Sequence, residues 1–220
     1  QCLRYVITYI QARREVAVPE NKAKNWPVNP PKLHHTTFTT LRMEQMVAWY
    51  GLVCGLRPVF QSDEASWLTN DDANHRIALL SPPGLKHPTD KGHETGIHHT
   101  AFEFSTFDMW LNNYIRLRDH QVLPFLTLDH GITMSVYYQD PDGNGVEIQV
   151  DGFGDWADSS EWIANAKEFA ENPIGTFFDP EKLVAAREEG LSFQEIHERT
   201  RAGEYLPASI PKDIFLPEVW

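Results

Sequence analysis

Two segments in the second half of the chain alternate between apolar and polar side chains. In residues 133–139 and 146–150, apolar side chains stand at every second position with polar ones mostly between them. This is the pattern of strands with one buried face. Between them, residues 140–145 supply the Pro, Asx and Gly residues of a tight reversal. The two segments are therefore predicted to form a β-hairpin. Its apolar face would pack on a core, while its polar face, with Tyr137 and Glu147, would border a cavity.

The same series of elements occurs twice along the chain. Residues 33–38 (LHHTTF) and 97–102 (IHHTAF) open the two copies, about 64 residues apart. Each opening precedes a predicted helix and then shorter strand-like runs, so strand, helix and three strands are repeated. An internal duplication with repeats at 32–81 and 96–152 follows from this order. The predicted elements after the first opening are a helix at 42–50 and runs at 59–60, 65–68 and 76–80, and the second helix is at 107–119.

The chain continues on both sides of this region. Residues 1–31 are expected to form an N-terminal extension, in which apolar residues at helical spacing give way to several prolines. Residues 156–220 are predicted to form a helical C-terminal extension. Its helices are expected at 160–171, at 182–189 and from Ser192 to about Arg201. Asp179 would cap the second helix, and Ser192 with Glu195 would form a capping box for the third.

Composition narrows the classes of function. With 220 residues, the chain has room for one substantial domain with extensions. The formal net charge of -12 argues against nucleic acid and anionic membrane surfaces as partners. Two cysteines without a CxxC pair favour a reducing, cytoplasmic environment. No apolar run reaches the roughly 20 residues of a membrane span. We also expect a homo-oligomer.

Three residues at corresponding places form a candidate metal site: His35, His99 and Glu147. Each histidine is the second of a pair, and strand alternation places it on the small, polar face, as with His35 and Thr37, while the first member would lie beside Phe38. Two neutral imidazoles and a carboxylate suit non-haem Fe(II), although Zn(II), Mn(II), Ni(II) or Co(II) would also fit. The alternative is a set of unrelated surface residues. The duplication favours the metal site, because it makes the two histidines equivalent.

These residues carry a resemblance to a known family. The two HHT openings, the DHG segment at 129–131 and DPDGNGVE at 140–147 resemble the vicinal oxygen chelate superfamily. This superfamily includes glyoxalase I, fosfomycin-resistance enzymes and type I extradiol ring-cleaving dioxygenases, and the likeness covers about residues 32–155. It implies an α+β fold in which paired βαβββ modules form an open, barrel-like metal-binding sheet. It also implies His35, His99 and Glu147 as the metal ligands.

Within that superfamily, three further positions resemble the extradiol dioxygenases. His75, in the segment 74–79 (NHRIAL), matches their catalytic histidine, and His130 matches a second pocket histidine. Tyr137 stands ten residues before Glu147, where the family has a tyrosine. The resemblance implies Fe(II), with Mn(II) as the second candidate, and an aromatic diol and O2 as substrates. His75 would accept and return a proton, while His130 and Tyr137 would hydrogen-bond the substrate oxygens.

Other interpretations remain open at this point. A glyoxalase-like isomerase or lyase, or a transferase, would use the same ligands, but usually with a second carboxylate or a basic pocket, neither of which is evident. A metal-free binding protein of the same fold would have lost the ligands. The loop 85–96 is longer than in the well-known catechol enzymes, and the chain has a single paired module. His75, His130 and Tyr137 could also have purely structural roles. They would then be a surface residue at a strand end, a turn residue and a half-buried sheet residue, respectively.

Overall fold

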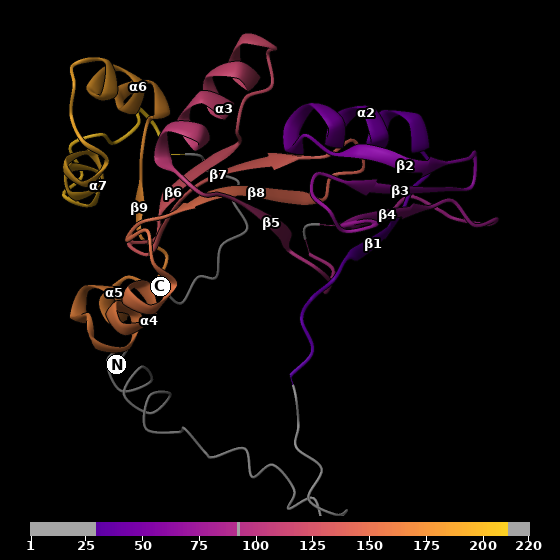
Figure 1. Ribbon diagram of the computed structural model, residues 1–220, viewed down its shortest axis with the longest axis horizontal. Helices are drawn as coiled ribbons and strands as arrows, with labels where there is room; N and C mark the ends of the chain where they lie inside the picture. The colour runs from indigo at the N-terminus through magenta and orange to yellow at the C-terminus, as the bar shows by residue number, and fades with distance from the viewer. Residues whose placement is uncertain (1–29, 92, 211–220) are drawn as a thin grey trace, which may run out of the picture. The chain divides into compact units, whose positions relative to one another are not determined.

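A computed structural model describes residues 30–91 and 93–210. The described residues contain two sheets, with strand orders β1-β4-β3-β2 and β5-β8-β7-β6-β9 (Figure 1). The N-terminal extension expected at residues 1–31 lies almost wholly outside the described residues, and its predicted helical spacing lies wholly outside them.

The two sheets repeat one topology. In each, the first strand pairs in parallel with the last strand of its module, and the remaining pairs are antiparallel. The α+β class with paired βαβββ modules is therefore confirmed. The first module consists of β1 (Thr36–Thr39), α2 (Met43–Cys54), β2 (Arg57–Gln61), β3 (Ala65–Thr69) and β4 (Ile77–Leu80). The second consists of β5 (His99–Phe104), α3 (Phe107–Asp119), β6 (Leu126–Asp129), β7 (Thr133–Gln139) and β8 (Gly145–Asp151).

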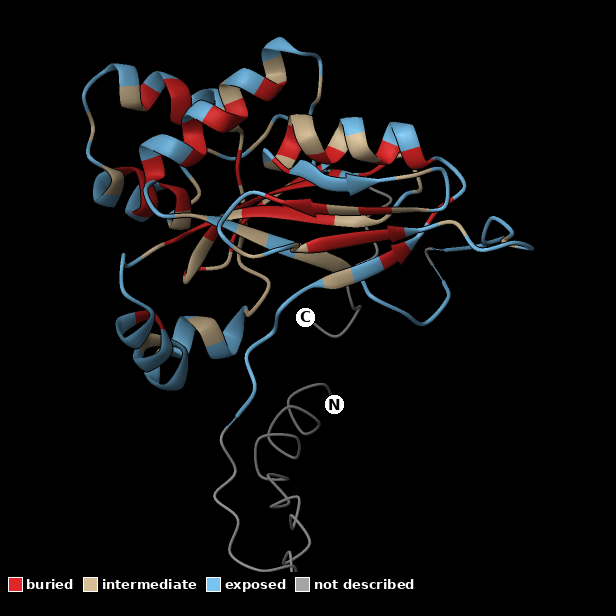
Figure 2. Ribbon diagram, turned by 45° about the vertical axis from the view of Figure 1, so that its right-hand side comes forward, coloured by how far each residue is buried: buried red, intermediate tan, exposed pale blue. Residues whose placement is uncertain are grey.

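Each helix covers one face of its own sheet (Figure 1). The predicted hairpin is present as β7 and β8, and its apolar side chains at alternate positions join the core that also holds the buried residues of α3. On the opposite face Ser135, Tyr137 and Glu147 are buried as well. Trp110 of α3 is fully buried and donates its indole N–H to the carbonyl oxygen of Ile148 at 2.9 Å. In Figure 2 the buried residues follow the facing sides of strands and helices. Most buried apolar residues of α2, α3 and both sheets belong to one core, while Leu126, Leu128 and Tyr137 form a second, smaller cluster with Ile174 and Phe177 packed against it.

Side chains of the hairpin turn between β7 and β8 contact the first module and so hold the two modules together. Tyr50 of α2 donates its hydroxyl to Asp140 Oδ2 at 3.2 Å, and Arg42 forms an ion pair with Asp142 at 3.3 Å. Asp140 also accepts the backbone N–H groups of Asp142 and Asn144 within the turn. The segment predicted only as a reversal is therefore also an anchor for the first module.

The C-terminal extension differs from expectation in two places. The helix expected at 160–171 is divided into α4 (Trp156–Asn165) and α5 (Lys167–Glu171), because Ala166 adopts an extended conformation. A short strand, β9 (Thr176–Phe177), was not predicted, since two residues cannot display alternation. The other two helices agree with expectation: α6 (Pro180–Glu188) is capped by Asp179, and α7 (Phe193–Arg201) begins with the capping box at Ser192.

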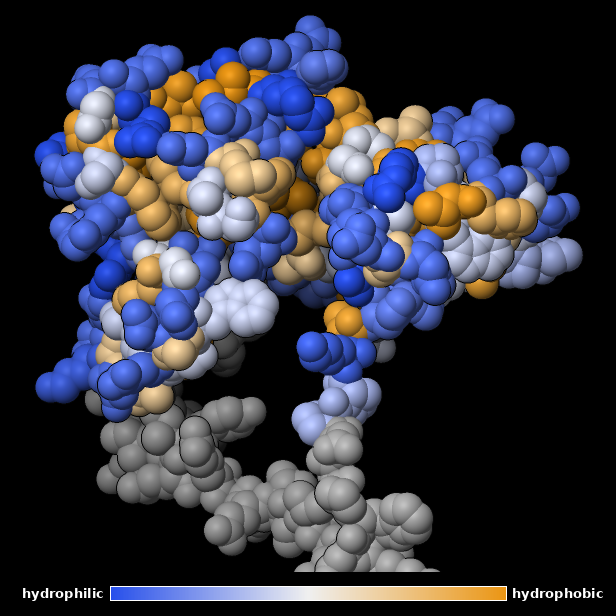
Figure 3. Space-filling view, viewed as in Figure 1, coloured by the Kyte–Doolittle hydropathy of each residue, from blue (hydrophilic) through white to orange (hydrophobic). Residues whose placement is uncertain are grey.

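Among the helices of the described residues, none is long and apolar enough to cross a membrane. Hydrophilic residues surround smaller hydrophobic groups across the face drawn in Figure 3. Scattered apolar side chains on a protein surface are ordinary.

Candidate metal centre

The open face of the second sheet carries a carboxylate between an imidazole and a phenol. In the strand register, Glu147 of β8 lies between Ala101 of β5 and Tyr137 of β7. His99 precedes Ala101 by two residues and therefore projects from the same face. His99 Nε2 lies 2.9 Å from Glu147 Oε2, and the Tyr137 hydroxyl donates to Glu147 Oε1 at 2.7 Å. Three residues far apart in sequence are thus brought into direct contact by sheet register.

A further contact joins His130 to these three residues, so that His99, Glu147, Tyr137 and His130 form one chain of contacts. Its Nε2 lies 2.8 Å from the hydroxyl oxygen of Tyr137. Burial lowers the pKa of His130, although the charge of Glu147 and a hydrogen bond with the Ile174 backbone oppose this effect. Burial and the same carboxylate raise the pKa of Tyr137 above its usual range. At neutral pH the chain therefore presents a neutral imidazole beside a protonated phenol.

Glu147 is ionised even though it is buried. Burial acts to raise its pKa, but the hydrogen bonds from His99, Ser135 and Tyr137 outweigh this and lower the pKa to about 2. A buried carboxylate is costly unless it is paired and hydrogen-bonded. The site is therefore built to hold a negative charge with an imidazole next to it.

A second group of imidazoles lies at the start of the first sheet. His35 directly precedes β1, His75 lies just before β4, and β1 and β4 pair in parallel from Thr36 and Ile77. Parallel pairing brings these two histidines to one edge, where their ring centroids are 4.2 Å apart. Burial, and then the neighbouring histidines, lower the pKa of His75. His75 therefore favours the neutral form.

The predicted ligand set is divided between these two places. Over residues 30–91 and 93–210, one group of three side chains has ligand atoms that all lie within 4.8 Å of one another, and it is His34, His35 and His75. His35 does not share such a group with His99 and Glu147. The structure thus joins His99, Glu147, Tyr137 and His130 in one contact chain, and His35 with His75 in another.

The position of His34 differs from the sequence prediction. Alternation assigned it to the face of Phe38, but it is exposed, and its Nδ1 lies 3.1 Å from His35 Nδ1. The reason is that both histidines precede β1, so the rule for successive strand residues does not apply to them. Arg76 reinforces this conformation by donating to the His34 carbonyl oxygen at 3.0 Å.

A cavity of about 810 Å³ opens beside the contact chain of His99, Glu147, Tyr137 and His130, and both His99 and Tyr137 line it. This volume lies within the usual range for small-molecule sites. Arg42 and Lys91 also line the cavity, and both contact Asp142 of the hairpin turn. The sequence showed no basic group here, because these cations come from two separate segments that only folding brings to the turn.

Paired βαβββ modules with imidazole and carboxylate donors on a sheet face define the vicinal oxygen chelate class of metal-binding folds. The chain belongs to the Glyoxalase/Bleomycin resistance protein/Dioxygenase superfamily, whose sequence model matches residues 32–148.

Two curated relatives come from Rhodococcus globerulus. Biphenyl-2,3-diol 1,2-dioxygenase 3 is 36% identical over 172 residues, which cover 78% of this chain and 90% of that protein. Biphenyl-2,3-diol 1,2-dioxygenase 2 is 36% identical over 177 residues, with coverages of 80% and 92%. Among solved structures, a glyoxalase/dioxygenase from Nostoc punctiforme has a TM-score of 0.47 and 21% identity, covering 57% of this chain and 94% of its own. A lactoylglutathione lyase from Agrobacterium tumefaciens has a TM-score of 0.45 and 18% identity, with coverages of 56% and 96%.

Proposed function

We propose that this protein is an extradiol dioxygenase, which opens a catechol-type aromatic ring beside the diol and places both atoms of O2 in the product. The observation that carries the proposal is the contact chain from His99 through Glu147 and Tyr137 to His130. It joins an anionic metal ligand to two groups that can donate or accept a proton. The 36% identity to two biphenyl-2,3-diol dioxygenases supports the same reaction class.

The donor types suit a divalent metal, which would have to draw His35 from its group with His34 and His75 toward His99 and Glu147. Glu147 is a buried anion, and a cation beside it would balance a charge that otherwise relies on hydrogen bonds alone. His99 and Glu147 are already in contact, and His35 occupies the strand start that corresponds to His99 in the other module. We assign these three residues as the metal ligands. A bound Fe(II) ion would supply the redox chemistry by which O2 reacts, and Mn(II) is the alternative.

The remaining residues handle substrate and protons. His75 is neutral near pH 7, so it can accept a proton from the diol and return it when the ring opens. Tyr137 borders the cavity and donates from its hydroxyl, while His130 can exchange a proton with it across 2.8 Å. The cavity of about 810 Å³ accommodates an aromatic diol. One diol and one O2 together contain all the atoms and electrons of the ring-opened aldehyde acid, so the reaction needs no further reductant.

The test is to purify the protein without oxygen, measure its metal content, and follow O2 uptake with catechol and with 2,3-dihydroxybiphenyl. We expect bound iron, one O2 consumed per diol, and a yellow ring-opened product. Glu147→Gln, which keeps the shape but removes the charge, should lose both iron and activity. Bound zinc or nickel, no O2 uptake with any catechol, and thiol-dependent isomerisation of methylglyoxal would instead establish the glyoxalase-like alternative.

A further inference from the structure

The C-terminal extension holds the segment that carries His130. Strand β9 pairs with the end of β6, where Thr176 lies opposite Asp129, the residue directly before His130. The backbone of Ile174 forms a hydrogen bond with the His130 ring. On the other side, the Trp162 ring lies so close to Gly131 that a Cβ there would overlap it. Residues from α4, β9 and the loop before β9 therefore surround His130 and its two neighbours.

A buried contact between an imidazole and a carboxylate completes this support. His197 of α7 places its Nε2 3.1 Å from Asp129 Oδ1, and both side chains are almost fully buried. The same carboxylate oxygen accepts the backbone N–H of Gly131 at 2.8 Å. Asp129 thus connects α7 to the backbone on the far side of His130. Among the described residues, the other oxygen of Asp129 has no hydrogen-bond partner.

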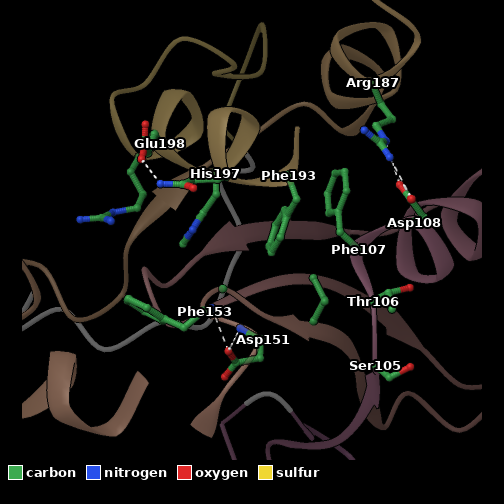
Figure 4. A pocket seen from close by; sticks show the side chains of 15 residues that line it. Ser105, Thr106, Phe107, Asp108, Asp151, Phe153, Arg187, Phe193, His197 and Glu198 are labelled. Carbon is green, nitrogen blue, oxygen red and sulfur yellow. Dashed lines mark hydrogen bonds and ion pairs between the residues drawn. The ribbon is translucent and has the colours of Figure 1, made fainter. Parts of the chain in front are cut away.

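The ring of His197 is itself closely fitted. It stacks on Phe193 with ring centroids 5.7 Å apart and meets the ring of Phe153 edge-on (Figure 4). A Cβ at Gly152 would lie 2.6 Å from His197 Cε1, so the backbone of the loop after β8 closes the third side. His197 lines a cavity of about 600 Å³ that does not include His99 or Tyr137. Its contact with the candidate active site therefore passes through Asp129.

We propose that His197, acting through Asp129, is a positioning residue that fixes His130 against Tyr137. This inference rests on the proposed function, because it assigns His130 a role in ring opening. Without the imidazole N–H, the carboxylate of Asp129 keeps only a backbone donor in a buried place, and it can regain a partner only by moving. Such a movement displaces the 129–131 turn and, with it, the 2.8 Å contact between His130 and Tyr137. Small displacements of a catalytic group cost much activity.

The primary test compares substitutions of His197 in the iron-loaded, full-length enzyme. His197→Phe keeps a stacked ring but removes the donor, whereas His197→Gln keeps an N–H near the same position. We expect His197→Phe to lower kcat by about 10- to 100-fold with KM and bound iron unchanged, and His197→Gln to recover most of the loss. If His197→Phe does not fold, His197→Asn, whose amide is too short to reach Asp129, replaces it.

Thr200→Val is the matched control on the same helix. Its hydroxyl is buried and donates to the Ile196 carbonyl oxygen at 2.7 Å, so the substitution loosens α7 without touching Asp129. We expect kcat to stay within about twofold of the parent, since the hydrogen bond that is lost lies within α7 and does not involve Asp129. A loss equal to that of His197→Phe would show that loosening α7 is sufficient, and would overturn a specific role for His197.

A double-mutant cycle distinguishes positioning from a general structural effect. If His197 acts through His130, then His197→Phe should change kcat by less than about twofold once His130→Ala is present. The same 10- to 100-fold loss in both backgrounds would overturn the inference, as would an unchanged kcat in the single variant. An inactive parent enzyme would refute the proposed function instead. In that case crystal structures still decide, because an unaltered His130–Tyr137 contact in His197→Phe would refute positioning.

Discussion

Two adjacent tyrosines on β7 offer a direct measurement of how the candidate metal centre is stabilised. Tyr137 and Tyr138 are both buried, but successive strand residues face opposite sides of the sheet. The Tyr137 hydroxyl contacts Glu147 at 2.7 Å and His130 at 2.8 Å. In the described part of the chain, the Tyr138 hydroxyl has no hydrogen-bond partner. Substituting each tyrosine by Phe therefore removes a hydroxyl group, which is hydrogen-bonded at Tyr137 and has no hydrogen-bond partner at Tyr138 among the described residues.

The expected difference follows from the cost of leaving buried polar groups unpaired. This cost is about 1–3 kcal/mol for each group, and Glu147 keeps its contact with His99. We expect Tyr137→Phe to lower the free energy of unfolding by about 2 kcal/mol. For a chain of this size, the melting temperature should fall by about 4–8 °C. Tyr138→Phe should leave it unchanged or slightly raised, because it removes a buried hydroxyl that has no partner.

Iron affinity provides a second readout of the same pair of variants. Tyr137 orients the carboxylate that we assign to the metal, and loss of such a partner typically weakens binding by about 10- to 100-fold. Thermal unfolding of the metal-free and iron-loaded forms, with chelator competition for iron, measures both effects. Equal melting temperatures for the two variants, or equal iron affinities, would refute the view that Tyr137 supports Glu147.

Three further predictions concern single positions. His75→Ala should keep its iron by elemental analysis but lose about 100-fold or more of its O2 uptake, because a general acid–base group is gone; full activity would remove His75 from the mechanism. Burial lowers the pKa of His130, so the unfolded chain takes up the proton first as pH falls. That part of the unfolding free energy should be complete above about pH 6.5 and decline below it, and urea unfolding of His130→Gln should show a flatter pH profile. Gly175→Ala should lower the melting temperature far more than Gly190→Ala, since both glycines have a positive φ but only a Cβ at Gly175 would overlap the Asp129 carbonyl oxygen; similar melting temperatures would contradict this contact.

The sequence predicted those elements whose signals lie within a few neighbouring residues, such as strand alternation and helix caps. The hairpin of β7 and β8 has long strands with apolar residues along one face and polar residues along the other, so alternation indicated both its position and the faces of Tyr137 and Glu147, although both faces are buried. The N-cap of α6 and the capping box of α7 were equally evident in the sequence. Strand β9 could not be predicted, because it forms only where the backbone of β6 is available to pair with it.

The candidate site was less predictable, because it depends on contacts between distant segments. His34 and His35 lie outside regular structure, so strand alternation gave no valid guide to the first of them. His197 was overlooked, although it occupies the buried face of α7 at helical spacing with Phe193 and Thr200. That spacing identifies a buried histidine, and a buried histidine requires a polar partner. The sequence could not show that the partner is Asp129.

The extent of the similarity to the two dioxygenases bears on the C-terminal extension. The family sequence model ends at residue 148, before α4, whereas biphenyl-2,3-diol 1,2-dioxygenase 3 matches over 172 residues, or 78% of this chain. A match of that length cannot lie within residues 1–148, so it reaches into the extension. Superfamily membership alone leaves the reaction open, since its members share the modules. The C-terminal extension pairs with β6 and contacts the turn that carries His130, and the two modules alone do not supply these contacts. We therefore expect the extension to contribute to catalysis.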